Sequence, residues 1–298
     1  MNKIEPSGVY GDGRGTLYVV ATPIGNMGDI SGRAIEVLSH ADMVAAEDTR
    51  HTGLLLSRLG ISVPLISCHE HNEVGRSQRI LAELGEGKSV ALVSDAGTPG
   101  ISDPGEVVIA QAIEAGFHVV PIPGPTAFVP ALTISGLPTS QFMFVGFLPR
   151  KPKERRRALA ELASVPATLI FYEAPHRLAA MLDDAAHELG DRRIAVCWEL
   201  TKKFERIWRG SLSCAVAQAG HDDRGEIVIV VEGARKAECE AISLEQGVIE
   251  AAADAVAVAD AGTGTSLKDA AEKAATRAGV PWRKVYAEAI KLQRGKQR

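Results

Sequence analysis

The chain has 298 residues, of which 46% are hydrophobic and 23% are charged, so it can bury the cores of two or three domains. Its formal net charge of −4 argues against a protein that coats nucleic acid with its whole surface, but allows a local basic patch. No apolar run reaches the roughly 20 residues that span a bilayer, and the N-terminus lacks the pattern of a signal peptide. We therefore expect a cytoplasmic protein that contacts no membrane.

The first residues, 1–15, are polar and rich in glycine, and they predict a flexible tail. Gly11, Gly13 and Gly15 imitate a dinucleotide-binding fingerprint. In a true fingerprint the glycines follow the first strand and open a helix, whereas these precede the first predicted strand. The tail therefore carries no prediction of a cofactor.

Between residues 16 and 122, apolar strands alternate with amphipathic helices. The predicted strands span 16–21, 43–46, 64–67, 89–93 and 117–122. Such alternation is typical of a parallel sheet with helices on both faces. We expect Asp29 to cap a helix over 30–38.

Loops rich in glycine and proline follow three of these strands, at 22–29, 94–105 and 121–126. The loop at 94–105 is the densest, because it contains three glycines, two prolines and two aspartates. The carboxyl ends of parallel strands lie at one edge of a sheet, where ligands bind in open α/β proteins. The three loops therefore predict a ligand cleft that faces a second domain.

The prolines of segment 121–126 predict a hinge, which separates an N-terminal α/β domain, 16–122, from a C-terminal α/β domain, 123–234. The second domain has predicted strands near 142–147, 168–172, 194–198, 206–208 and 227–232. The last strand is almost entirely Val and Ile, so we expect it to be buried on both faces.

The final part, 243–298, predicts a small helical module that resembles a helix-turn-helix. Ser243 and Gln246 fit a capping box at the start of its first helix, and further helices are expected over 267–277 and 282–293. A plain packing or dimerisation appendage is the alternative interpretation.

No metal site is predicted. The run Cys68-His69-Glu70-His71 contains suitable ligands, but in an extended segment its neighbouring side chains point to opposite sides, and no second cluster completes a zinc site. The four cysteines are scattered, and we expect them to be free thiols.

Five motifs stand in order along the chain, at 20–29, 46–50, 94–105, 123–127 and 171–177. Together they resemble the small-subunit ribosomal RNA methyltransferase I family of the tetrapyrrole-methylase superfamily, from about Thr16 to Gly233 and more weakly in the C-terminal helices. The resemblance implies two α/β domains of the tetrapyrrole-methylase type with a cofactor cleft between them, usually in a homodimer. It also implies methyl transfer from S-adenosylmethionine to the ribose 2′-hydroxyl of one cytidine in the decoding region of 16S rRNA, with the 30S subunit as partner.

Two alternative functions stay open. The same architecture supports a methyltransferase that acts on a tetrapyrrole. Such a substrate needs neither the run of basic residues at 150–157 nor the C-terminal helical module. A non-enzymatic nucleic-acid-binding protein would leave the cleft loops without a role.

The resemblance assigns cofactor contacts to the cleft loops. The implied residues are Thr22, Pro23, Ile24, Asp95, Gly97, Ile101, Ser102, Pro123, Gly124, Thr126 and Tyr172. A carboxylate such as Asp95 can help to hold the sulfonium cation, or can instead shape its own loop.

Catalysis and RNA binding give two further sets of candidates. Positioning alone can drive methylation of a hydroxyl, but Glu47, Asp48 and Glu173 in strand-end loops are candidates for a general base, as are His69 and His176.

Candidate phosphate contacts are Arg50, Arg150, Lys151, Lys153, Arg155, Arg156, Arg157 and Arg177. The alternative for the run at 150–157 is a solvated start of a helix.

Overall fold

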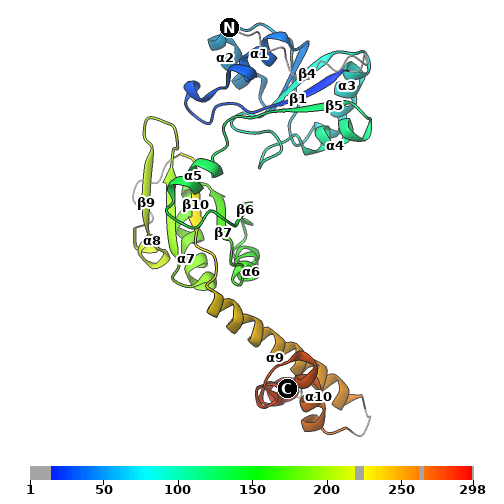
Figure 1. Ribbon diagram of the computed structural model, residues 1–298, viewed down its shortest axis with the longest axis vertical. Coiled ribbons are helices and arrows are strands. Elements are labelled where there is room, and N and C mark those ends of the chain that lie inside the picture. The colour runs from blue at the N-terminus through cyan, green and yellow to red at the C-terminus, as the bar shows by residue number, and fades with distance from the viewer. Residues whose placement is uncertain (1–14, 219–224, 262–264, 297–298) are drawn as a thin grey trace.

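The computed structural model describes residues 15–218, 225–261 and 265–296, so the predicted N-terminal tail lies outside the described residues apart from Gly15. Two sheets and a set of helices follow one another along the chain and along the long axis of the molecule (Figure 1). None of the helices within these described ranges is long and apolar enough to cross a membrane.

The first sheet is entirely parallel, as predicted. Its strands are β1 (Thr16–Val20), β2 (Met43–Ala46), β3 (Leu65–Ser67), β4 (Ser89–Val93) and β5 (His118–Ile122), in the order β3-β2-β4-β1-β5. Pro121 lies in β5 at the edge of the sheet, where the missing N–H does not interrupt a second ladder.

Helices cover both faces of this sheet. They are α1 (Gly32–His40), α2 (Thr49–Leu59), α3 (Glu73–Gly85) and α4 (Glu106–Glu114). Val37 of α1 and Leu56 of α2 pack in one buried cluster, and Ile80 of α3 and Val108 of α4 pack in another. The apolar stripe of each helix therefore covers its own side of the strands.

The predicted cap at Asp29 is wrong. Asp29 ends a short 3₁₀ helix, Met27–Asp29, and Ser31 caps α1 by accepting a hydrogen bond of 3.1 Å from the Ala34 N–H. Ser31, two residues later, has a side-chain oxygen that caps a helix as well as that of aspartate does. The 3₁₀ turn therefore precedes α1, and α1 begins two residues later than predicted.

The second sheet is mixed. Its strands are β6 (Phe142–Phe147), β7 (Thr168–Glu173), β8 (Arg193–Trp198), β9 (Arg206–Ser211) and β10 (Ile227–Val231), in the order β6-β7-β10-β8-β9. Only β6 and β7 are parallel among these pairs. Strand β10 lies at the centre with every residue buried, as its Val and Ile content predicts.

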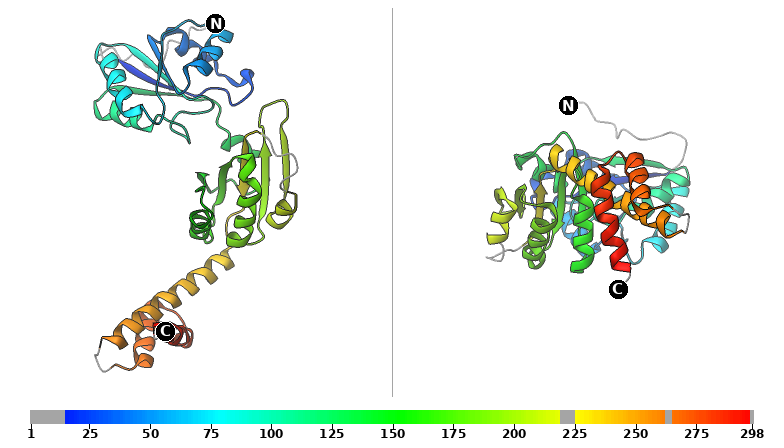
Figure 2. Two further views of the ribbon diagram at one scale, coloured as in Figure 1. Left: turned by 180° about the vertical axis from the view of Figure 1, so that it is seen from behind. Right: turned by 90° about the horizontal axis from the view of Figure 1, so that it is seen from below.

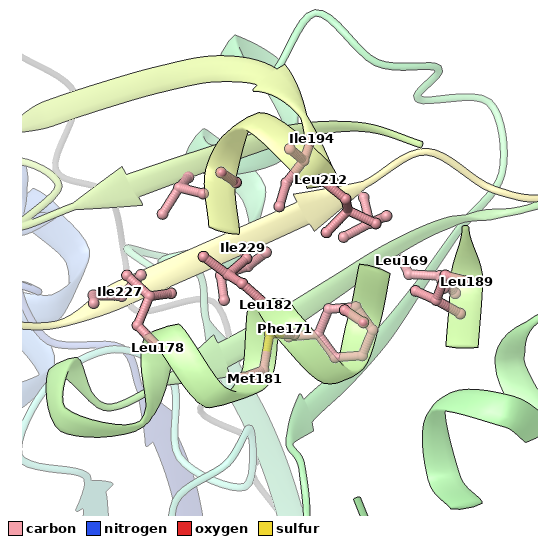
Figure 3. Packing of buried hydrophobic residues seen from close by; sticks show 14 of the residues in the cluster. Leu169, Phe171, Leu178, Met181, Leu182, Leu189, Ile194, Leu212, Ile227 and Ile229 are labelled. Carbon is pink, nitrogen blue, oxygen red and sulfur yellow. The ribbon is translucent and has the colours of Figure 1, made fainter. Parts of the chain in front are cut away.

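Five helical segments accompany the second sheet. They are α5 (Phe128–Ile134), α6 (Pro152–Leu162), a 3₁₀ turn (Pro175–Arg177), α7 (Leu178–Leu189) and α8 (Leu212–Gln218). Figure 3 shows Met181 of α7 packed beside Phe171 of β7 and Ile229 of β10, and all three side chains are fully buried. This core fixes the end of β7, where Tyr172 and Glu173 stand.

The C-terminal helices are α9 (Lys236–Asp260), α10 (Leu267–Ala278) and α11 (Trp282–Lys296). They extend away from the second sheet (Figure 2) and share a small core that includes Ala252, Ala271 and Val285. The predicted capping box is wrong, because α9 begins at Lys236 and Ser243 lies inside it.

Candidate functional site

The three predicted loops meet at the carboxyl edge of the first sheet. Thr22 and Gly97 exchange two backbone hydrogen bonds, of 2.8 and 3.1 Å, which join the loops after β1 and β4. The Thr98 hydroxyl donates a hydrogen bond of 3.1 Å to the Pro125 carbonyl, which joins the loop after β5. Gly124 packs against Ala21 so closely that a Cβ at this position would lie 2.9 Å from the Ala21 Cβ. The loops therefore form one fixed surface.

A cavity of about 380 Å³ lies between this surface and the second sheet. Its walls are formed by Ile24, Glu47, residues 95–98, residues 101–103, Thr126, Ala127, Phe147, residues 172–175 and residues 225–228. Its size is in the range of small-molecule sites, and it combines apolar walls with several carboxylates.

Most of the predicted cofactor residues lie around this cavity. Its walls include Ile24, Asp95, Gly97, Ile101, Ser102, Thr126 and Tyr172. Thr22 and Pro23 line a neighbouring cavity instead. Pro123 and Gly124 line neither cavity, and Gly124 lies behind the surface against Ala21.

The neighbouring cavity has a volume of about 250 Å³. It shares Ile24, Asp95, Ala96 and Glu226 with the larger one. Its other walls are Thr22, Pro23, Gly25, Met27, His51, Leu54, Leu55, Arg58 and Lys202. The two cavities therefore share a wall, and cationic side chains line the smaller one.

The wall of the larger cavity is acidic. Burial raises the pKa of Glu47, and the charge on Asp95 raises it further. Burial, followed by the charge on Glu47, raises the pKa of Asp103 to about 7. Such a cluster favours a cationic ligand, because a positive charge relieves the repulsion between the carboxylates.

Sequence reasoning missed two of these acidic residues. Asp103 stands inside the loop at 94–105, so its position in that motif was an available signal. Glu226 precedes β10 and reaches the cleft only through the tertiary fold.

Glu173, the last residue of β7, is almost fully buried in the cavity wall. Its Oε1 accepts a hydrogen bond of 2.8 Å from the Ala174 N–H and lies 3.1 Å from the Arg177 Nε. Its Oε2 has no hydrogen-bond partner among the described residues. Burial raises the pKa of Glu173, which makes it a stronger base than an exposed glutamate.

Asp48 lines neither cavity. It caps α2 by accepting a hydrogen bond of 2.8 Å from the Arg50 N–H, and its Oδ2 pairs with the Arg50 Nη2 at 2.7 Å. These hydrogen bonds from Arg50 hold the pKa of Asp48 well below its usual range. Its contacts are therefore those of a helix cap, while Arg50 stays 90% exposed.

The basic run begins α6 and does not act as one surface. Arg150, Lys151, Lys153, Arg156 and Arg157 are exposed. Lys151 pairs with Glu154 at 3.0 Å, and Arg157 pairs with Glu161 at 3.1 Å.

The expectation of a phosphate contact is corrected for Arg155, whose side chain is 6% exposed and pairs with the buried Asp184 at 2.6 Å. Arg156 pairs with the same carboxylate from the outside. Arg177 is also mostly buried, and it donates a hydrogen bond of 2.7 Å to the Leu148 carbonyl. A side chain held in this way cannot reach RNA without breaking its buried contacts.

Comparison with known proteins places these features in a family. Residues 16–216 match the family described as Tetrapyrrole (Corrin/Porphyrin) Methylases. The chain is 46% identical to Ribosomal RNA small subunit methyltransferase I of Halalkalibacterium halodurans, over 95% of this chain and 98% of the relative. It is 44% identical to the Bacillus subtilis protein of that name, over 91% and 93% of the two chains.

Solved structures share the fold at low identity. A cobalt precorrin-4 methyltransferase matches with a TM-score of 0.55 and 17% identity, over 73% of this chain and 94% of that one. A uroporphyrin-III-C-methyltransferase from Thermus thermophilus matches with a TM-score of 0.52 and 20% identity, over 74% and 93%. Both matches support a fold of two α/β domains, each built on one sheet.

Proposed function

Because the chain belongs to the tetrapyrrole methylase family, and within it to the ribosomal RNA small subunit methyltransferase I proteins, we propose that this methyltransferase 2′-O-methylates a cytidine in the decoding region of 16S rRNA. The 46% identity over nearly the whole chain is the observation that carries the proposal. The cytoplasm, where 30S subunits are found, is its proposed place of action, and a homodimer its proposed form.

The larger cavity fits S-adenosylmethionine. Ile101, Phe147 and Val228 offer apolar surface to a flat adenine ring, and Asp95 offers a carboxylate to a cation. When bound, S-adenosylmethionine supplies a methyl group on a positively charged sulfur. The proposed holding residues are Ile24, Asp95, Gly97, Ile101, Ser102, Thr126 and Tyr172.

Four residues of the loops after β1 and β5 support this cavity from outside its walls. They are Thr22, Pro23, Pro123 and Gly124. The backbone bonds of Thr22 to Gly97 set the distance between the first two loops. We assign these four residues to shaping the cofactor surface.

Among the candidate bases, Glu47 and Glu173 line the cavity and Asp48 does not. A carboxylate with a raised pKa accepts a proton more readily near neutral pH. The proposed base is therefore Glu47 or Glu173, while orientation of the acceptor hydroxyl supplies a large part of the rate.

RNA contact is proposed for the exposed basic residues. These are Arg50, Arg150, Lys151, Lys153, Arg156 and Arg157. Their positive charge attracts phosphates and positions the RNA without reading its sequence. The C-terminal helices are a second proposed contact.

Transfer of labelled methyl groups tests the proposal. The wild-type protein is mixed with S-adenosylmethionine and one of three acceptors: 30S subunits that lack the modification, naked 16S rRNA, or a tetrapyrrole precursor. Label at one ribose 2′-hydroxyl, mapped by resistance to alkaline cleavage, supports the proposal. Label in the tetrapyrrole alone overturns the substrate assignment.

A further inference from the structure

The turn between β8 and β9, residues 199–205, has an unusual backbone. Glu199 has φ 50° and Thr201 has φ 67°, and neither is glycine. A residue other than glycine in this left-handed region is strained, and such strain persists only where the surroundings hold it. Strain of this kind is concentrated at functional sites.

Hydrogen bonds hold this turn in one shape. The Thr201 N–H donates to the Glu205 Oε2 at 2.7 Å, and the Lys202 N–H donates to the Glu199 carbonyl at 3.0 Å. The Lys202 Nζ lies 2.9 Å from the Glu199 Oε1 and 3.2 Å from the Glu226 Oε2. The turn is therefore held by contacts among its own residues and by an ion pair with Glu226, which precedes β10.

The turn also reaches the first half of the molecule. The Lys202 side chain lies against Gly25 so closely that a Cβ there would collide with it. Lys202 lines the smaller cavity together with His51 and Arg58. In Figure 1 the hairpin of β8 and β9 extends toward the first sheet. The turn thus stands at the place where the two halves enclose the cleft.

The contacts that hold the turn give no reason for the exposed aromatic side chain of Phe204. Its side chain is 74% exposed, and its only ring contact in the described chain is with Lys203, whose Nζ lies 5.5 Å from the ring centroid. Leaving a large apolar ring in water forfeits the gain from burial, so core packing gives no reason for an aromatic residue here. A rigid turn that displays an aromatic face beside a lysine is instead suited to single-stranded nucleic acid.

On the basis of the proposed function, we propose that Phe204 stacks against a base of the single-stranded rRNA segment that carries the acceptor nucleotide, while Lys203 contacts a phosphate of that segment. Stacking tolerates any base, so this contact holds the strand and does not read its sequence. The fixed turn would present the ring in the same position to every substrate. The adjoining smaller cavity, with Arg58 and Lys202 in its walls, lies next to the held strand.

Three variants test this proposal: Phe204→Ala, Phe204→Trp and Lys203→Ala. Methyl transfer to unmodified 30S subunits is measured with subunits and S-adenosylmethionine varied separately. Phe204→Ala should raise the KM for subunits about tenfold and leave the KM for S-adenosylmethionine unchanged, since stacking acts on the RNA alone. Phe204→Trp should keep the wild-type KM, and Lys203→Ala should raise the KM for subunits and leave that for S-adenosylmethionine unchanged, since it removes only a phosphate contact. Ile113→Ala is the matched control, because Ile113 of α4 is 59% exposed and lines neither cavity.

A binding assay separates this proposal from the proposed function. A single-stranded RNA oligonucleotide of the acceptor segment carries 2-aminopurine, whose fluorescence decreases on stacking. Wild-type protein and Phe204→Trp should quench it, and Phe204→Ala should not. Quenching without methyl transfer to rRNA overturns the proposed function and supports the stacking contact. Equal quenching and equal KM in Phe204→Ala overturn the stacking contact while the function stands. A KM that rises for subunits, with unchanged binding of the oligonucleotide, points to a ribosomal protein instead and also overturns it.

Discussion

The Oδ1 of Asp95 accepts a hydrogen bond of 2.9 Å from the backbone N–H of Asp48, the residue that caps α2. Asp95 thereby ties the loop after β4 to the loop after β2 while it lines both cavities. Its carboxylate thus has a structural contact and a free charge, and two substitutions can separate them.

Asp95→Asn keeps an oxygen for the Asp48 N–H but removes the negative charge. We expect it to weaken S-adenosylmethionine binding about tenfold, or ~1.4 kcal/mol, with little change in thermal stability. Asp95→Ala should weaken binding by a similar amount and also lower the melting temperature, because the hydrogen bond is lost. Calorimetric titration and thermal unfolding measure the two effects. Unchanged affinity in both variants would show that the charge does not hold the cofactor.

Asp103 makes stability depend on pH. Its pKa is raised to about 7, mainly by burial, so the folded protein keeps a proton that the unfolded chain releases from about pH 4. The free energy of unfolding should therefore decrease as the pH rises from 4 to 7. Asp103→Asn should be about 1 kcal/mol more stable than wild type at pH 8 and equal to it at pH 4. Urea unfolding across this range is the measurement, with the exposed Asp183→Asn as control.

The ion pair of Arg155 with Asp184 should matter for folding. Arg155→Met leaves the buried Asp184 with only the partly exposed Arg156, and we expect a loss of about 3 kcal/mol in unfolding free energy. Arg157→Met breaks an exposed pair with Glu161 and should cost less than about 1 kcal/mol. Urea unfolding compares them, and equal losses would contradict a buried structural role for Arg155.

The exposed members of the basic run should matter for RNA instead. Lys153→Glu with Arg157→Glu should weaken binding to 30S subunits about tenfold at low salt and reduce the salt dependence of binding. Affinity for S-adenosylmethionine should stay the same. Arg79→Glu, on the exposed side of α3, is the control for a change of net charge. If Arg79→Glu weakens subunit binding as much per reversed charge as the double variant does, the effect belongs to net charge and not to α6.

Gly124 should tolerate no side chain. In Gly124→Ala the new Cβ would lie 2.9 Å from the Ala21 Cβ and 3.3 Å from its carbonyl oxygen, so the loop after β5 must move. We expect a loss of about 1–3 kcal/mol in stability and weaker cofactor binding. Gly75→Ala in α3 meets no atom within 4 Å and should be neutral or slightly stabilising. Melting temperatures of the two variants give the comparison.

The first sheet could be predicted from the sequence because its signals are local. Alternating strands and helices imply a parallel sheet, and parallel strands bring their carboxyl-end loops together at one edge. Thr22, Thr98 and Pro125 therefore lie where the loop positions placed them. The strand directions of the second sheet depend on crossovers between distant segments, which residue patterns do not encode.

Contacts that form only in the tertiary structure were not predictable. Lys202, in the turn after β8, pairs with Glu226 before β10 and packs against Gly25 in the first half of the chain. Arg155 belongs to a basic run in the sequence, but the turn of the helix directs it inward to Asp184 while Lys153 stays exposed. Composition gives the sign of a segment's charge, and the helical phase decides which charges reach solvent.

Helix α9 has 25 residues, which at 1.5 Å per residue amounts to about 37 Å. Only its first half, 236–247, separates the second sheet from the core of the C-terminal helices, because Val248, Ala252 and Val256 of α9 belong to that core; this makes the molecule elongated (Figure 1). A substrate that contacts both the cleft and the C-terminal helices must itself span the distance between them. An oligonucleotide of a few residues is too short to do so, whereas a folded ribosomal subunit is much larger. If the C-terminal helices contact the RNA as proposed, we expect their removal to weaken binding of assembled 30S subunits more than binding of a short oligonucleotide.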